Sequence, residues 1–127
     1  MKLWIDDVRP APEGYIRCKS VNDAKNEIIN RENATKKMLE FCRELDARGS
    51  YDYADEVYMA ALNGFLSLID IDHDAGDYAS DGGDYIKLLD WLEETGRNYP
   101  IHIHSQNVVG RMNMEAICRR NGWTIVD

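Results

Sequence analysis

Residues 65–72 read Phe-Leu-Ser-Leu-Ile-Asp-Ile-Asp, an apolar run typical of a buried central strand. The run ends in acidic residues, as expected where the carboxyl end of a strand meets solvent. Residues 2–7, Lys-Leu-Trp-Ile-Asp-Asp, repeat this pattern near the start of the chain. Two such strands predict a parallel sheet with carboxylates at the edge where α/β proteins bind their ligands.

Helical patterns alternate with further strand patterns along the rest of the chain. A weak strand is predicted at 15–18, and a helix is predicted from Val21, where Ser20 and Asp23 have the spacing of a helix cap. The remaining predictions are helices at about 33–49, 51–62, 85–92 and 109–120, and strands at 101–105 and 123–126. Strands alternating with helices predict an α/β fold of three layers, with a mostly parallel five-stranded sheet covered by helices on both faces.

The link between the first two predicted strands is short. Residues 8–14 contain Pro10 and Pro12, which favour an extended backbone and oppose a helix. A parallel crossover usually needs about a dozen residues or more. Either this segment crosses in extended form, or the second strand is absent or antiparallel.

Length and charge limit the function classes. The 127 residues give room for a single domain, residues 1–127, with a core that needs no disulfide or metal to hold it. The 15 basic and 23 acidic side chains give a formal net charge of −8, which makes long nucleic acid an unfavourable partner. A small phosphorylated ligand, held by a metal and one or two arginines, suits this charge better. The sequence does not indicate the oligomeric state.

Cysteine usage and hydropathy indicate the compartment. The three cysteines lie far apart and form no Cys-x-x-Cys pair, which favours a reducing environment. The apolar N-terminal run is interrupted at Asp6, too early for a signal-peptide core, and no apolar run approaches membrane-spanning length. We therefore expect a cytoplasmic protein without membrane association.

The acids at the strand ends are candidate metal ligands. Asp6, Asp7 and Asp72 would lie at the ends of adjacent strands and offer their carboxylates to one hard divalent cation, with Mg²⁺ expected first and Mn²⁺ as the alternative. A shared cation would offset the repulsion among these carboxylates. Three nearby acids are instead interpreted as solvated loop residues and helix caps: Asp70, Asp74 and Asp77.

Residues 104–111 follow a predicted strand and lead into a predicted helix. Their hydroxyl, helix-start amides and guanidinium form a candidate phosphate cradle of Ser105, Asn107 and Arg111. The alternative is that Ser105 or Asn107 caps the helix and that Arg111 lies on the surface.

Two histidines flank the acidic residues. His73 and His104 are candidates for general acid and base, or for ligands of a softer metal. His102 would share a face with His104 in a regular strand, but it lies one step deeper in the sheet. We therefore interpret His102 as a structural residue.

Three motifs follow one another along the chain: Ile5-Asp-Asp-Val-Arg-Pro10, Asp72-His-Asp-Ala-Gly76 and His104-Ser-Gln-Asn-Val-Val-Gly-Arg111. Together they resemble the cyclic-phosphate processing receiver domains, a branch of the flavodoxin-like response-regulator receiver fold. The resemblance spans almost the whole chain except roughly residues 31–60, where an extra helical insertion is expected. It implies a receiver-like fold, with Mg²⁺ at Asp6, Asp7 and Asp72 and with Asp72 in the place of the phosphoryl acceptor.

One departure from ordinary receivers directs the functional hypothesis. The lysine that follows their last strand has no counterpart up to Asp127, and Arg9 or Arg111 is the expected replacement. The added histidines suit acid–base chemistry on a phosphodiester. The leading hypothesis is therefore a metal-dependent phosphoesterase acting on a cyclic phosphate, either a cyclic nucleotide or a 2',3'-cyclic phosphate at an RNA end.

This hypothesis assigns the residues to three roles. The metal would be held by Asp6, Asp7 and Asp72, catalysis would involve His73, His104 and Asp72, and phosphate oxygens would be bound by Arg9, Ser105, Asn107 and Arg111. Two rival hypotheses remain. The chain would be a signalling receiver phosphorylated on Asp72, or a non-catalytic module that binds a nucleotide or a protein through the same edge.

Overall fold

The computed structural model describes residues 1–127, apart from the side chains of residues 62 and 63. Its sheet consists of four strands, β1 (Lys2–Ile5), β2 (Tyr15–Cys18), β3 (Leu68–Ile71) and β4 (Ile101–Ile103). They lie in the order β2-β1-β3-β4, and every pair is parallel. The predicted parallel α/β sheet is thus confirmed.

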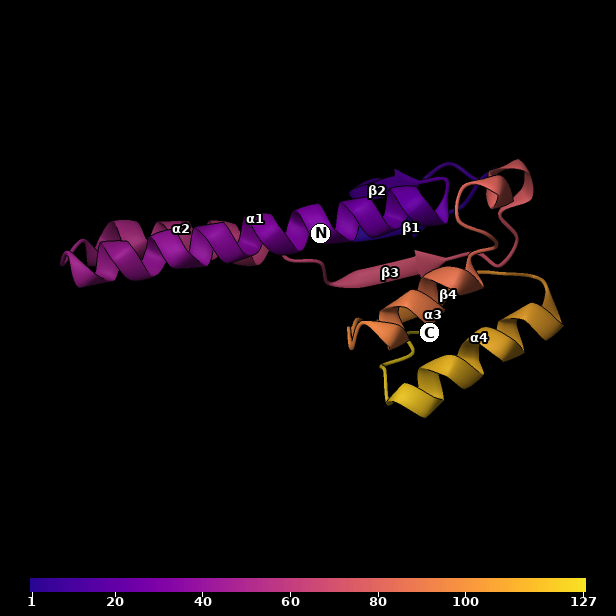
Figure 1. Ribbon diagram of the computed structural model, residues 1–127. Helices are drawn as coiled ribbons and strands as arrows, with labels where there is room; N and C mark the ends of the chain where they lie inside the picture. Colours follow the sequence, from indigo (N-terminus) through magenta and orange to yellow (C-terminus); the bar gives the residue numbers. More distant parts are fainter.

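Helices occupy most of the remaining chain (Figure 1). They are α1 (Val21–Ala47), α2 (Tyr51–Asn63), α3 (Ile86–Glu94) and α4 (Val108–Asn121), with a short 3₁₀ helix, η1 (Gly76–Ser80), after β3. The cap expected at Ser20 is present, since its side chain accepts a hydrogen bond from the backbone N–H of Asp23. Gly122 ends α4 in the left-handed conformation, with φ of 69°. No helix in the described part of the chain has the length and apolar character needed to cross a membrane.

The short link between β1 and β2 crosses without a helix. Residues 6–14 connect the two strands, and β2 pairs with β1 in parallel register from Lys2 opposite Tyr15 to Ile5 opposite Cys18. Of the alternatives left open by the sequence, the second strand is thus present and parallel, and the proline-containing segment crosses without a helix, through bends at residues 7–9 and a turn at residues 13–14.

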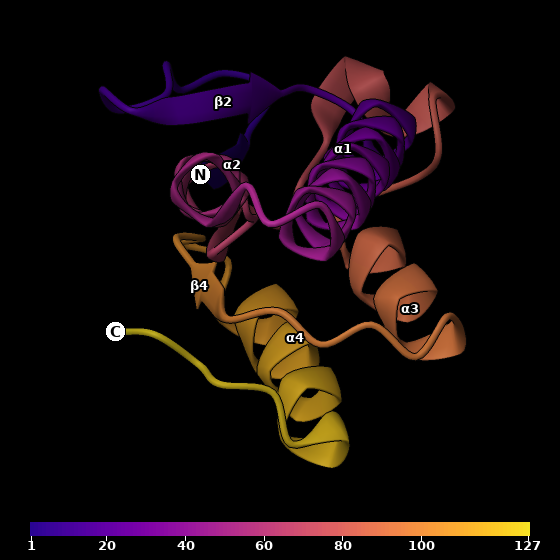
Figure 2. The same ribbon diagram turned by 90° about the vertical axis from the view of Figure 1, so that its left-hand side faces the viewer.

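The helices cover one face of the sheet, which corrects the expected three layers. Figure 2 shows α1, α3 and α4 together on one side of the strands. The link between β1 and β2 contains no helix, and the later crossovers all progress across the sheet in the same direction, from β2 to β3 and on to β4. Since parallel crossovers are almost always right-handed, connections that progress in one direction place their helices on one face.

Side chains sort onto the two faces by the parallel register. Leu3, Ile69 and Ile101 are partners in register, and they are fully buried beneath the helices, as are Leu88 of α3 and Met114 of α4. The opposite face carries Trp4, Asp70 and His102 in register. Because successive residues of a strand point to opposite faces, the uncovered face carries the polar side chains of Asp70 and His102 at the level where the covered face is apolar.

The expected fifth strand is reduced to a single bridge. Trp123 is buried in the core, and after it Ile125 makes one isolated parallel bridge to Ile101 of β4. Ile101 donates its N–H to the carbonyl of Thr124 and accepts from the N–H of Val126. The prediction of five strands was therefore wrong, because only these residues lie alongside a β4 that is itself three residues long.

The predicted helical insertion is a hairpin that extends away from the sheet (Figure 1). It consists of the distal part of α1 and all of α2, and α1 is one continuous helix where the sequence suggested two. Between the two helices lies a small cluster of Cys42, Leu45 and Ala54, separate from the main core. The insertion therefore packs outside the central sheet.

Candidate metal and phosphate site

Three polar side chains follow the ends of three adjacent strands. Asp6, Asp72 and His104 come directly after β1, β3 and β4, at neighbouring positions of the register. The backbone pairing continues to these residues, because Asp72 donates its N–H to the Ile5 carbonyl at 2.9 Å and His104 donates to the Ile71 carbonyl at 3.0 Å. The sheet itself therefore positions the three groups at its carboxyl edge.

Asp6 is a fully buried carboxylate with several donors around it. Its Oδ1 accepts hydrogen bonds from the N–H groups of Val8 and Arg9, both at 2.9 Å, and its Oδ2 lies 2.9 Å from His104 Nε2. Burial raises the pKa of Asp6, but these hydrogen bonds together outweigh burial and hold the pKa below its ordinary value. Asp6 is therefore a carboxylate, and a ready cation ligand, across the neutral pH range.

His104 is held on both sides and on one ring face. Nε2 lies 2.9 Å from Asp6 Oδ2, and Nδ1 lies 2.5 Å from Asp70 Oδ1. The indole ring of Trp4 stacks on the imidazole with centroids 3.9 Å apart and planes 2° apart. Burial lowers the pKa of His104, but the two carboxylates together raise it above its ordinary value. The His104 ring is thus fixed between two carboxylates, one at each nitrogen.

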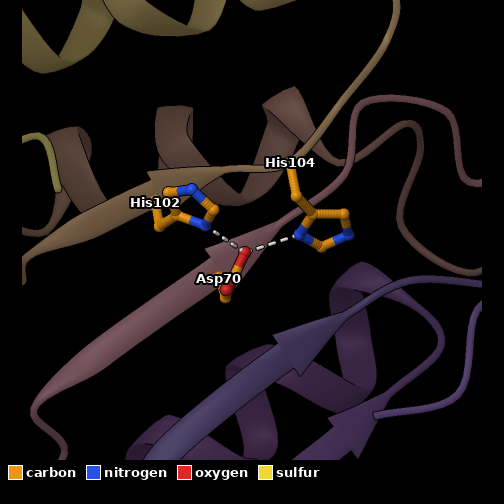
Figure 3. A group of neighbouring side chains, drawn as sticks. All are labelled: Asp70, His102 and His104. Carbon is orange, nitrogen blue, oxygen red and sulfur yellow. Dashed lines mark hydrogen bonds and ion pairs between the residues drawn. The ribbon is translucent and has the colours of Figure 1, made fainter. Parts of the chain in front are cut away.

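Asp70 is a central member of the site, not the solvated loop acid that the sequence suggested. It lies within β3, is 5% exposed, and its Oδ1 accepts hydrogen bonds from Nδ1 of both His102 and His104 (Figure 3). The register places His102 directly opposite Asp70. His102 lies on the face of His104, as expected, and it contributes the second hydrogen bond to this carboxylate.

Two overlapping groups of side chains bring potential metal ligands together. In one group, oxygens of Asp6 and Asp72 and a ring nitrogen of His104 all lie within 4.8 Å of one another. The other group is Asp70, His102 and His104. Asp7 belongs to neither of these two groups of described residues, and its carboxylate lies against Gly76, where a side chain would collide with it. The structure thus brings two of the three predicted acidic ligands together and adds an imidazole.

The buried Tyr85 side chain lies near the carboxylates of Asp6, Asp7 and Asp72. Burial raises the pKa of the Tyr85 hydroxyl, and the nearby charges of Asp7, Asp6 and Asp72 raise it further. The hydroxyl donates to the carbonyl of Lys19 at 2.7 Å, which ties the loop after β3 to the start of α1. Asp7 therefore contributes to the negative potential of this edge even though it stands apart from the closest ligand groups.

His73 forms a second cluster at the rim of the site. Its Nδ1 lies 2.7 Å from Asp74 Oδ1 and 3.4 Å from the Asn107 amide nitrogen. The ring packs against Gly110 so closely that a Cβ on this glycine would lie 2.6 Å from Nε2. Asp74, predicted to be a solvated acid, is exposed but also orients the ring. His73 is therefore held by one nitrogen, with the other directed at the start of α4.

Three of the four predicted phosphate-binding residues lie close to the site histidines, and the fourth points away. Asn107 caps α4 by accepting a hydrogen bond from Gly110 N–H, and Ser105 accepts one from Asn107 N–H at 3.1 Å. Arg9 donates to the His104 carbonyl at 3.1 Å. Arg111 instead pairs with Glu115 one turn along α4 and has a side chain that is 49% exposed. Arg9, Ser105 and Asn107 thus lie near the histidines, while Arg111 points along its own helix.

Sequence reasoning missed Asp70 and Trp4 as parts of this site. Asp70 lies two residues before Asp72, so both side chains point to the same face of β3. His102 in β4 and His104 directly after it have the same spacing. The paired patterns Asp-x-Asp and His-x-His were the available signal, while the stacking of Trp4 depends on the uncovered sheet face and had no signal in the sequence.

Comparison with known proteins identifies the family. A family model for the cyclic-phosphate processing receiver domain matches residues 46–120, which is more than half of the chain. The matched segment includes Asp70, Asp72 and all three histidines of the chain, while Asp6 lies before it. No curated protein and no solved structure gives a match. On the family match, the chain belongs to the cyclic-phosphate processing receiver domains.

Proposed function

We propose that this protein is a metal-dependent phosphoesterase acting on a cyclic phosphate, in the form of a cyclic nucleotide or a 2',3'-cyclic phosphate at an RNA end. The single observation that carries the proposal is the convergence of Asp6, Asp72 and His104 at one sheet edge. Two acids this close repel each other unless a cation is bound between them. The family name supplies the cyclic phosphate as the substrate class.

The acids would hold a divalent metal, either Mg²⁺ or Mn²⁺, with Asp6 and Asp72 as direct ligands and Asp7 adding negative charge. When bound, such an ion polarises a phosphoryl oxygen and lowers the pKa of a coordinated water. The donor set fits this group, because Asp6 keeps its charge through backbone hydrogen bonds that a cation does not disturb. Asp6 would therefore be ionised and oriented for a cation by the protein itself.

Proton transfer is assigned to His73. A cyclic phosphate opens when an oxygen nucleophile attacks phosphorus and one ester oxygen leaves with a proton, so a donor must lie near the leaving oxygen. His73 is oriented by Asp74 through one ring nitrogen, and its other nitrogen has no protein partner among the described residues. The sequence also predicted His104 for this work, but both of its nitrogens are engaged by carboxylates.

Substrate phosphate oxygens would be bound at the rim between the two histidines. Ser105 and Asn107 lie at the start of α4, and Arg9 brings a cation to the same edge. For Arg111 to take part, its side chain must leave Glu115. A small phosphorylated ligand with an exposed cyclic phosphate suits this arrangement better than a long duplex does, because the net charge of the chain is −8.

The cytoplasm is the proposed compartment of this activity. All three cysteines, Cys18, Cys42 and Cys118, are buried and unpaired. Burial raises the pKa of Cys118 to about 11, so its thiol stays protonated and unreactive. A reducing compartment preserves such thiols.

A turnover screen tests the proposal. Purified protein is incubated with cyclic mononucleotides and with an RNA oligomer ending in a 2',3'-cyclic phosphate, with Mg²⁺, with Mn²⁺, or with EDTA. We expect metal-dependent hydrolysis that is lost in Asp72→Asn and kept in Asp77→Asn, which changes an exposed acid of η1.

The same assay separates the rival functions. Stable phosphorylation of Asp72 by a small phosphodonor, without any cyclic-phosphate turnover, would replace the enzyme by a signalling receiver. Tight nucleotide binding with neither reaction would establish a binding module instead.

A further inference from the structure

The convergent edge offers a nitrogen donor as well as two carboxylates. Oxygens of Asp6 and Asp72 and a ring nitrogen of His104 lie within 4.8 Å of one another. The nitrogen on the Asp6 side is Nε2, at 2.9 Å from Oδ2. A cation placed among these groups would therefore meet an imidazole as well as carboxylates.

The far side of the imidazole is arranged as it is in many metal-bound histidines. Nδ1 faces Asp70 Oδ1 at 2.5 Å, and an ionised carboxylate can only accept a hydrogen bond. The proton of a neutral His104 therefore resides on Nδ1, which leaves the Nε2 lone pair facing Asp6 Oδ2 at 2.9 Å. A carboxylate that fixes the tautomer and direction of a ligating histidine is a recurrent outer-shell feature of metal sites.

The surroundings of His104 disfavour a role in proton exchange with substrate. The side chain is 8% exposed, Trp4 covers one ring face, and Arg9 donates to its backbone carbonyl. A general acid must reach the leaving oxygen directly or through one water. A ring fixed on both nitrogens and one face has the rigidity expected of a ligand.

The second group of donors, Asp70, His102 and His104, is the weaker metal site. There one carboxylate oxygen already accepts from two imidazole nitrogens, at 2.8 and 2.5 Å, so the group is satisfied without an ion. Asp6 and Asp72, in contrast, are two acids converging on one edge. Of the two groups, only this one contains two carboxylates whose mutual repulsion a cation would offset.

We propose that His104 is a metal ligand through Nε2, with Asp70 as its positioning residue, and that the site prefers a first-row divalent metal such as Mn²⁺ to Mg²⁺. Imidazole nitrogen is a poor donor for Mg²⁺ and a good one for the transition metals, whereas carboxylates serve both. This inference rests on the metal site of the proposed function and specifies its ligands and its ion.

Pulsed electron paramagnetic resonance on Mn²⁺ bound to the full chain tests this ligation without any substrate. A directly bound imidazole gives a nitrogen modulation of the Mn²⁺ signal, and growth on ¹⁵N-histidine changes its pattern. The chain has three histidines, so His73→Gln and His102→Gln serve as matched controls. We expect the modulation in the wild type and in both controls, and its loss in His104→Gln.

Calorimetry adds the affinities. Mn²⁺ is expected to bind at least tenfold more tightly than Mg²⁺, and His104→Gln should remove most of this preference. Asp70→Asn should weaken Mn²⁺ binding by roughly 10- to 100-fold, as is typical when the carboxylate behind a ligating histidine is changed. If His104→Gln fails to fold, the labelled wild type with the two control variants still identifies the ligand by elimination.

The outcomes separate this inference from the proposed function. Mn²⁺ bound in an Asp72-dependent manner without nitrogen modulation would overturn the role of His104 and leave the acidic metal site standing. Modulation that disappears in His73→Gln or His102→Gln would also overturn it. Failure of both Mn²⁺ and Mg²⁺ to bind would overturn the metal site and the proposed function together.

Discussion

Gly110 is a residue whose missing side chain shapes the site. It lies in the first turn of α4, and a Cβ there would collide with the ring of His73. At an ordinary helix position, alanine in place of glycine would stabilise the protein by about 1 kcal/mol. Here the same change must displace the histidine from Asp74 and Asn107.

We therefore expect Gly110→Ala to reduce cyclic-phosphate turnover by on the order of 10²-fold, the contribution typical of a general acid or base. Mn²⁺ affinity, measured by calorimetry, should stay unchanged because the metal ligands lie at the ends of the strands and not on α4. Asn113→Ala, an exposed change on the same helix, is the control. Full turnover in Gly110→Ala would remove His73 from the mechanism.

At the residue scale, the sequence predicted the acids better than their partners. Asp6 and Asp72 were found because each ends an apolar run, which is a local signal. The pairing of Asp70 with His102 depends on the register between β3 and β4, and no single strand contains that information. Arg111 was predicted to bind phosphate, but its guanidinium donates to Glu115 on the same helix. A phosphate group would have to compete with Glu115 for it.

Glu32 anchors the long helix α1 to the body of the protein. Its carboxylate accepts hydrogen bonds from Arg97 at 2.9 to 3.1 Å and from the Tyr99 hydroxyl at 2.5 Å. Burial raises the pKa of Glu32, but the bonds from Arg97 and Tyr99 outweigh it and lower the pKa below its ordinary value of 4.5. A carboxyl with a depressed pKa stabilises the fold above its unfolded-state pKa, and this contribution is lost as pH falls through the folded-state pKa.

Glu32→Gln is accordingly expected to lower the free energy of unfolding by about 1 kcal/mol at pH 7, a partly exposed charged hydrogen-bond network being worth less than a buried one. The difference from the wild type should shrink as pH falls below 4.5. Urea titrations at several pH values measure this. Arg31, whose ion pair with Glu27 is local to α1, offers a control as Arg31→Gln. A difference independent of pH would contradict the anchoring role of the charge.

The hairpin formed by α1 and α2 is separable from the site by its position. Its own cluster around Cys42 and Ala54 lies apart from the main core. The metal ligands Asp6, Asp72 and His104 lie at the opposite, carboxyl edge of the sheet. Replacing residues 36–60 by a short Gly-Ser linker should therefore leave Mn²⁺ affinity within a few-fold of the wild type, by calorimetry. A shortened chain that does not fold would show that the hairpin belongs to the core.

At the element scale, apolar spacing predicted the α-helical segments and all four strands, but not the short 3₁₀ helix η1. It failed at the junction near residue 33, where the polar residues between two apolar stretches suggested a break, yet α1 continues to Ala47. Polar residues without glycine or proline do not end a helix. It also failed for the last strand, since residues 123–126 have strand composition but meet only the short β4.

Across the whole molecule, metal binding and stability should be coupled. Asp6 and Asp72 converge on one sheet edge, where a bound cation would offset the repulsion between their carboxylates. Mn²⁺ at about 100 times its dissociation constant is expected to stabilise the protein by about 2.7 kcal/mol, since it binds the folded state alone. Thermal unfolding with and without Mn²⁺ measures this. Asp72→Asn should lose most of the metal-dependent rise, and an undiminished rise in that variant would place the ion elsewhere.

The number of layers could not be predicted from the elements alone. Alternating strands and helices predicted helices on both faces, but which face a helix covers depends on the order of the strands in the sheet. That order, β2-β1-β3-β4, with a helix-free link between β1 and β2, is what leaves one face uncovered. The same uncovered face allows Trp4 to reach across to His104.

The bridge between Ile125 and Ile101 has a consequence for solubility. Residues 124–126 occupy backbone groups of β4, a strand at the margin of the sheet, and so screen it from strands of other molecules. Removing residues 124–127 while keeping the core residue Trp123 should leave the fold intact and the margin bare. We expect this shortened protein to associate at concentrations where the full chain stays dispersed, as measured by static light scattering. Equal scattering from the two would contradict a guarding role, whereas the expected increase would make these few residues a built-in protection against fibrous assembly.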